Sequence, residues 1–153
     1  MAMPVAYLGN KSLLEGTTVG FLSSRHVSSG AVLRCYDWAT DVAGTVGAVV
    51  SGFHADIERD VLRLLLQQQQ PVIMVLARTL YKELPTELHA PLEAGRLLCI
   101  STAPRAVRVG RSAALYRNEY IAELADRLVF GYISPESALA QLYDQYRDKA
   151  QLL

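Results

Sequence analysis

The chain contains only two cysteines and no long apolar segment. Cys35 and Cys99 lie far apart and form no C-x-x-C motif, so we expect two small core residues in a reducing compartment and no disulfide framework. No stretch approaches the ~18 apolar residues that a membrane-spanning helix needs, and the amino terminus has no apolar run behind a basic start. These absences predict a cytoplasmic protein.

An excess of charge of one sign is also missing, because fifteen acidic residues balance fifteen basic ones. Net charge therefore gives no argument for nucleic-acid binding, and any basic surface has to be local. Local asymmetry exists, since no acidic residue occurs between Glu15 and Asp37 or between Glu93 and Glu119. Arginine supplies twelve of the fifteen cations, and its planar guanidinium suits phosphate better than the point charge of lysine. The second acid-free interval carries Arg96, Arg105, Arg108, Arg111 and Arg117.

Several catalytic and cofactor motifs are absent. No G-x-G-x-x-G follows a predicted strand, and Gly9–Ser12 lacks the adjacent glycine and lysine of a P-loop. The three histidines are scattered, which favours capping or packing over a metal site. A triad of Ser24, His54 and Asp56 could be drawn only without the G-x-S-x-G elbow that such a serine needs. We therefore predict no catalytic residue, no cofactor and no metal.

What is present is an alternation of strands and helices. With 153 residues and 51% apolar composition, the chain fits one domain spanning residues 1–153. Helix-length amphipathic segments separate the apolar runs, a pattern that predicts a Rossmann-like, doubly wound α/β fold: a mostly parallel sheet with helices on both faces. A terminal helix is expected from Pro135 to about Leu152, with Ser134 as its cap. The predicted strands are Thr18–Leu22, Ala48–Val50, Val72–Ala77, Leu97–Ile100 and Leu128–Tyr132.

The loop after the first predicted strand is the most informative segment. Ligands bind such sheets at the carboxyl ends of the strands, where the first turn of a helix favours anions. Ser24, Arg25 and Ser28 offer hydroxyl donors and a forked cation there, although serine capping of the helix explains the same residues. In the next loop, Gly52 would let the backbone approach a ligand.

A second candidate segment follows the arginine-rich interval. Arg117 and Asn118 fall in a predicted helix, where they could address a phosphate and a base edge or could form a solvated helix face. We expect Arg25 and Arg117 to face solvent and to contribute little to stability.

These segments, taken in order, resemble the DNA-processing protein A (DprA/Smf) family of the Rossmann-like SLOG superfamily, and its small stand-alone members in particular. The family motifs are G-S-R-x-x-S, V-S-G-L-A-x-G-I-D, V-L-G-x-G-L with Y-P-x-E-H, and R-N-R-I-I-A. The similar stretches here are Ser23–Ser28, Val49–Glu58, Val75–Leu80 with Pro85–His89, and Arg117–Ala122, and the resemblance covers about residues 18–139.

The resemblance implies a non-catalytic module that binds the phosphates of single-stranded DNA, forms a homodimer and works with a recombination-related protein. The alternative is a nucleotide-ligand sensor or a nucleotide-processing enzyme of the same superfamily, although the P-G-G-x-G-T-x-x-E signature of its phosphoribohydrolases is absent. Ser24, Arg25 and Ser28 would clamp one phosphate, Gly52 would permit close approach, and Asn118 would reach a base. The phosphate track would continue over Arg78, Arg108, Arg111 and Arg117.

The chain departs from the family pattern at the expected ligand face. Asp56 and Glu119 add negative charge where the family has none, which would weaken or redirect binding. The other departures are Ser23, Glu58, Ala77 and Thr79.

Overall fold

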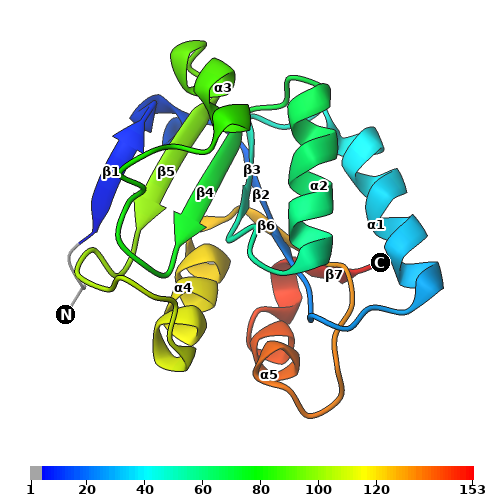
Figure 1. Cartoon of the computed structure of the whole chain (residues 1–153). Coiled ribbons are helices and arrows are strands. Elements are labelled where there is room, and N and C mark those ends of the chain that lie inside the picture. Colours follow the sequence, from blue (N-terminus) through cyan, green and yellow to red (C-terminus); the bar gives the residue numbers. More distant parts are fainter. Residues whose placement is uncertain (1–4) are drawn as a thin grey trace.

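A seven-stranded sheet forms the centre of the protein (Figure 1). The computed structural model describes residues 5–153. The strand order is β1-β5-β4-β3-β2-β6-β7; β1 pairs antiparallel with β5, and every other pairing is parallel. The Rossmann-like α/β fold class is confirmed. The strands are β1 (Ala6–Gly9), β2 (Thr18–Leu22), β3 (Ala48–Ser51), β4 (Val72–Leu76), β5 (Leu97–Ser101), β6 (Arg127–Phe130) and β7 (Ala150–Leu152).

Helices cover both faces of the sheet because the central strands are buried on both sides. On one face, α1 (Ser29–Val42) and α2 (Asp56–Gln67) lie side by side and bury apolar residues such as Ala39 and Val61 against β2, β3 and β4 (Figure 1). On the other face, α4 (Arg111–Leu124) and α5 (Ala138–Gln145) contribute Ile121 and Leu139 to a second core cluster. No helix among residues 5–153 has both the length and the apolar character needed to cross a membrane.

The remaining elements are short. A 3-10 helix, η1 (Lys11–Glu15), follows β1, and the connection from β4 to β5 contains only η2 (Thr86–Leu88) and the five-residue α3 (His89–Glu93). On the face of the sheet that α1 and α2 cover, the part of β4 that α2 leaves uncovered is therefore covered by loop residues and not by a long helix.

The carboxyl-terminal region corrects the sequence prediction. The helix begins at Ala138 with Ser137 as its cap, not at Pro135 with Ser134, and it ends at Gln145. A turn, η3 (Arg147–Lys149), then leads into β7, which pairs with β6. Tyr143 and Tyr146 are partly buried against the second core cluster.

The sheet has a topological switch point between β2 and β6. From β2 the chain proceeds through α1 and α2 to β3 and β4, whereas β6 is reached by α4 on the opposite face. The helices that follow β2 and β6, α1 and α5, pack on opposite faces of the sheet, and such a switch point is where these sheets bind ligands.

Candidate nucleic-acid interface

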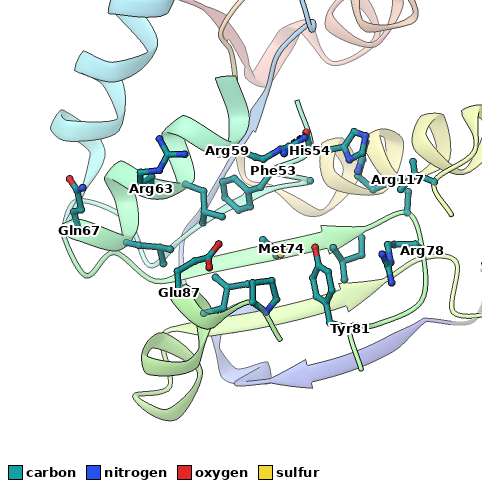
Figure 2. Close-up of a pocket in the computed structure, with 18 residues that line it drawn as sticks. Phe53, His54, Arg59, Arg63, Gln67, Met74, Arg78, Tyr81, Glu87 and Arg117 are labelled. Carbon is teal, nitrogen blue, oxygen red and sulfur yellow. Dashed lines mark hydrogen bonds between the residues drawn. The ribbon is translucent and has the colours of Figure 1, made fainter. Parts of the chain in front are cut away.

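Two adjoining cavities lie along the carboxyl ends of the strands. The switch-point cavity, of about 510 Å³, includes the predicted residues Ser24, Arg25, Arg111, Arg117 and Asn118. The second, which we call the α2 groove, has a volume of about 680 Å³ and includes the predicted Gly52, Arg78 and Arg117 (Figure 2). The two cavities share His54, Val109 and Arg117, so they adjoin. Ser28 and Arg108 line neither cavity.

The two serines of the first loop have structural partners. The Ser24 hydroxyl accepts the backbone N–H of Ser134 at 2.9 Å, which ties the loop after β2 to the loop after β6. The Ser28 hydroxyl accepts the N–H of Ala31 at 3.3 Å and caps α1. The capping alternative thus describes Ser28, which stands away from the switch-point cavity.

Arg25 and the start of α4 provide the accessible positive charge of the switch-point cavity. Arg25 and Arg111 are both exposed, and neither forms a salt bridge within residues 5–153. Arg111 is the first residue of the 14-residue α4, and the cap residue Gly110 places no side chain on the free N–H groups of the first turn. These groups and the helix dipole add a partial positive charge to the two guanidinium groups.

Arg117 corrects the sequence prediction, because it is buried and not solvated. Its side chain is only 5% exposed, and its Nε donates a hydrogen bond to Oδ1 of Asn118 at 2.9 Å. A Cβ atom on Gly52 would lie 2.5 Å from Nη1 of Arg117. The missing side chain of Gly52 therefore makes room for this guanidinium, and close approach of a ligand at Gly52 stays a prediction.

Glu58 is the buried acid that faces this region. Its carboxylate accepts backbone N–H groups from His54 at 2.9 Å, Ala55 at 3.1 Å and Ser23 at 3.3 Å, so it joins the loop after β2 to the turn after β3. Burial raises the pKa of Glu58, while these hydrogen bonds and the charge of Arg117 oppose that rise. Burial lowers the pKa of Arg117, and Glu58 counteracts this effect.

His54, at the junction of the two cavities, lies in a positive electrostatic potential. Partial burial lowers the pKa of His54, and the charges of Arg117, Arg59 and Arg25 lower it further. These three arginines come from α4, from α2 and from the loop after β2. A chain without net charge therefore still concentrates positive charge at one place, which is what anion binding requires.

Sequence reasoning missed part of the α2 groove. Arg59 and Arg63 lie one helical turn apart on α2, and their i, i+4 spacing was a usable signal for a shared helix face. Figure 2 shows these two side chains along one side of the groove, with Tyr81, Arg78 and Glu87 along the other. Tyr81 lies in a loop, and no periodicity of the sequence pointed to it.

The comparisons with known proteins agree with the geometry. DNA processing protein A from Helicobacter pylori, solved in a study of its single-stranded DNA binding mode, has a TM-score of 0.76 and 19% identity, and the match covers 97% of this chain and 70% of that one. DNA processing protein A from Streptococcus pneumoniae has a TM-score of 0.77 and 18% identity, and the match covers 97% of this chain but only 53% of that one. A molybdenum cofactor binding protein from Rippkaea orientalis is more distant, with a TM-score of 0.56 and 7% identity over 89% of this chain and 88% of that one.

No curated protein matches the sequence. The likeness to solved structures at these identities establishes the fold, and the family follows from the sequence itself. The family described as DNA recombination-mediator protein A matches residues 2–135, which is most of the chain. This protein belongs to the DNA recombination-mediator protein A family.

Proposed function

We propose that this protein binds single-stranded DNA through its backbone phosphates at the switch-point cavity, as one domain and without catalysing a reaction. The observation that carries the proposal is the convergence of Arg25, Arg111 and Arg117 on one cavity beside the start of α4. Guanidinium groups and free helix N–H groups are strong phosphate donors. The single-stranded DNA binding described for the Helicobacter pylori relative supports the same ligand.

The arginines differ in the roles that we assign to them. The exposed Arg25 and Arg111 contact phosphates directly, and the exposed Arg108 and the half-buried Arg78 extend the track. The buried Arg117 adds positive potential from beneath the cavity. The carbonyl oxygen of Asn118 is engaged by Arg117, which leaves its amide NH₂ as a donor to a base edge.

The environment of Glu58 supports a non-catalytic role. Glu58 is the buried carboxyl of the switch-point cavity, and both of its oxygens already accept backbone N–H groups. A general acid or base has to present a free lone pair or proton to the substrate. This carboxylate is instead used to hold two loops together.

The proposal is tested by a salt titration of a fluorescein-labelled oligothymidylate, followed by anisotropy. Arg25→Ala should weaken binding to all sequences alike and flatten the log-log salt slope by about 0.7, because one phosphate contact is lost from a single strand. Arg127→Ala is the matched control. Arg127 is an exposed arginine at the amino end of β6, whereas the switch-point cavity lies at the carboxyl ends of the strands. Unchanged affinity and slope in a folded Arg25→Ala protein would refute the proposal.

The volume of the α2 groove favours one alternative, a sensor or enzyme for a single nucleotide. A cavity of about 680 Å³ is in the range that holds a small ligand. The same titration with a panel of mononucleotides distinguishes the two functions: tight binding of a mononucleotide with none of the oligomer would select the alternative.

We further propose that the protein forms a homodimer and works with a recombination-related protein. The open edge of β7 and the half-exposed side chain of Leu152 on it support self-association. A monomer mass by light scattering at roughly tens of micromolar, where a micromolar dissociation constant is visible, would overturn the dimer. The family description supports the second partner, and co-sedimentation of the protein with a recombinase on single-stranded DNA tests it.

A further inference from the structure

The α2 groove follows α2 across the sheet and does not stay at the strand ends. Its rim on the helix side runs from Arg59 through Arg63 to Gln67 (Figure 2). From Arg59 to Gln67 the helix rises by about 12 Å, and it runs from the carboxyl end of β3 toward the amino end of β4. The far half of the groove therefore leads away from the switch-point cavity and lies outside the proposed phosphate track.

The groove is open because the helix pattern of the sheet is interrupted beside α2. In a doubly wound sheet, each parallel connection usually carries a helix that covers the apolar face of its strands. The connections from β2 to β3 and from β3 to β4 carry α1 and α2, whereas the connection from β4 to β5 carries only η2 and the five-residue α3 (Figure 1). Within residues 5–153, no third long helix packs beside α2 on this face.

Apolar side chains form the floor of the groove, and polar side chains form its rims. Leu62 of α2, Met74 of β4 and Leu88 of η2 are buried in the floor. Leu66 of α2 and Tyr81 of the facing loop are only half-buried, so apolar surface also reaches solvent. An apolar floor between polar rims fits the apolar face of an amphipathic helix, which places side chains at i, i+3, i+4 and i+7 into such a groove.

The charge of the rims favours an acidic partner. One acid, Glu87, lines the groove against four arginines, which come from α2, from the loop after β4 and from α4: Arg59, Arg63, Arg78 and Arg117. Arg78 forms no salt bridge within residues 5–153. Figure 2 shows Arg59 and Arg63 on one side of the groove and Arg78 on the other. Carboxylates on both flanks of a bound helix would therefore meet guanidinium groups on both rims.

The acids of α2 leave much of this charge uncompensated. Asp56 is almost fully exposed and lies 3.9 Å from Arg59, a geometry that contributes little. Asp60 pairs with Arg63 at 3.2 Å, but it faces α1, where its second oxygen accepts the hydroxyl of Tyr36 at 2.8 Å. A carboxylate arriving from the groove side would therefore find both guanidinium groups accessible.

We propose that the α2 groove binds an acidic amphipathic helix of a partner protein. The apolar side chains of this helix would rest on Leu62, Leu66 and Tyr81, and its carboxylates would pair with the arginines of the two rims. Neighbouring helices pack at interaxial distances of about 8–10 Å, so the partner helix would lie beside α2 where a third long helix would otherwise cover the sheet. This interaction is distinct from DNA binding, because a chain of phosphates would follow the carboxyl ends of the strands and not the length of α2.

A displayed peptide library tests the inference. Random peptides of about three helical turns are sorted for binding to the labelled wild-type protein. Clones that still bind the Leu66→Trp variant, in which the larger ring fills the groove from α2, are discarded. The remaining peptides should carry apolar residues at helical spacing together with an excess of Asp and Glu. Failure to enrich any clone, or enrichment of peptides without that excess, would overturn the inference, and a mononucleotide that binds the groove in that case would select the nucleotide alternative.

Charge reversal in the groove gives the quantitative test. Arg63→Glu should weaken the best peptide roughly tenfold or more in anisotropy, because like charges then face each other, and lysine in place of one glutamate of the peptide should restore the affinity. Arg34→Glu is the matched control, since Arg34 is an exposed arginine of α1 and does not line the groove. Equal affinities for the wild-type protein and Arg63→Glu would refute binding in the groove. Arg25→Ala should leave the peptide affinity unchanged, so failure of the proposed DNA binding and failure of this inference are separate results.

Discussion

Replacement of Arg117 by alanine should lower the free energy of unfolding. Replacement of a surface arginine would leave this free energy nearly unchanged. The side chain is 5% exposed, and its charge acts on the buried Glu58, although no salt bridge joins the two among residues 5–153. The substitution removes a buried side chain with its packing, while the protein no longer bears the cost of burying the guanidinium. We therefore expect a loss of about 1–3 kcal/mol in stability, the common range for a single substitution. For a chain of this length the melting temperature falls by roughly 2–12 °C.

The pH dependence of this loss identifies its cause. The pKa of Glu58 lies above its ordinary value of 4.5, so the folded state holds the proton more tightly than the unfolded state does. The contribution of Glu58 to stability is thus fully present below about pH 4.5 and is lost as the pH rises through the folded-state pKa. Arg117→Ala removes a charge that lowers this pKa, so the variant should be more strongly destabilised at about pH 7.5 than at about pH 4.5.

Urea unfolding followed by circular dichroism at both pH values measures this difference. Arg25→Ala is the exposed control, and its midpoint should move little. In a background that carries both Glu58→Gln and His54→Gln, the effect of Arg117→Ala should lose its pH dependence, because Arg117 also lowers the pKa of His54. Equal midpoints for Arg25→Ala and Arg117→Ala, or a pH-independent difference, would show that the effect of the Arg117 charge on Glu58 is not the source of the stability.

Three further predictions follow from the same region. Affinity for single-stranded DNA should rise as the pH falls through the pKa of His54, because a bound phosphate favours protonation of this ring, and His54→Gln should flatten the pH profile measured by anisotropy. Ser28→Ala should cost about 1 kcal/mol of stability by removing the cap of α1, with unchanged affinity; a weaker complex would restore Ser28 to the phosphate site. Gly52→Ala should destabilise by about 1–3 kcal/mol in urea, because its Cβ displaces the guanidinium of Arg117, and wild-type stability would contradict this packing.

The central strands could be predicted and the edge strands could not. β2 has the predicted bounds because every residue in it is buried, which gives a continuous apolar run. β1 and β7 are short and partly exposed, and they exist because β5 and β6 offer partners. The terminal helix, predicted to run to about Leu152, ends at Gln145 because pairing with β6 draws the chain into β7.

The candidate site likewise has parts that could be predicted from the sequence and parts that could not. The structure brings Arg25 and Arg111 together at one cavity, as residues in or directly after loops at the carboxyl ends of strands, and their contact with phosphate stays a prediction. The burial of Arg117 depends on Gly52, which is distant in sequence, so an Arg-Asn pair alone could not show it. One signal was available: Arg117 lies four residues before the buried Ile121, on the same helix face.

The pairing of β2 with β6 makes assembly of the proposed phosphate site a late event in folding. β2 ends at residue 22, but its neighbour β6 begins only at Arg127. The edge of β2 that pairs with β6 therefore stays uncovered until most of the chain has been synthesised. Contacts of such long sequence separation form slowly, and an uncovered strand edge invites pairing with other molecules. During synthesis, the loop with Arg25 would be present long before Ser137 and Leu139 close the cavity around it. A nascent chain would therefore acquire the proposed affinity for DNA only when β6 and α5 have docked, and DNA binding would then report that this domain has folded.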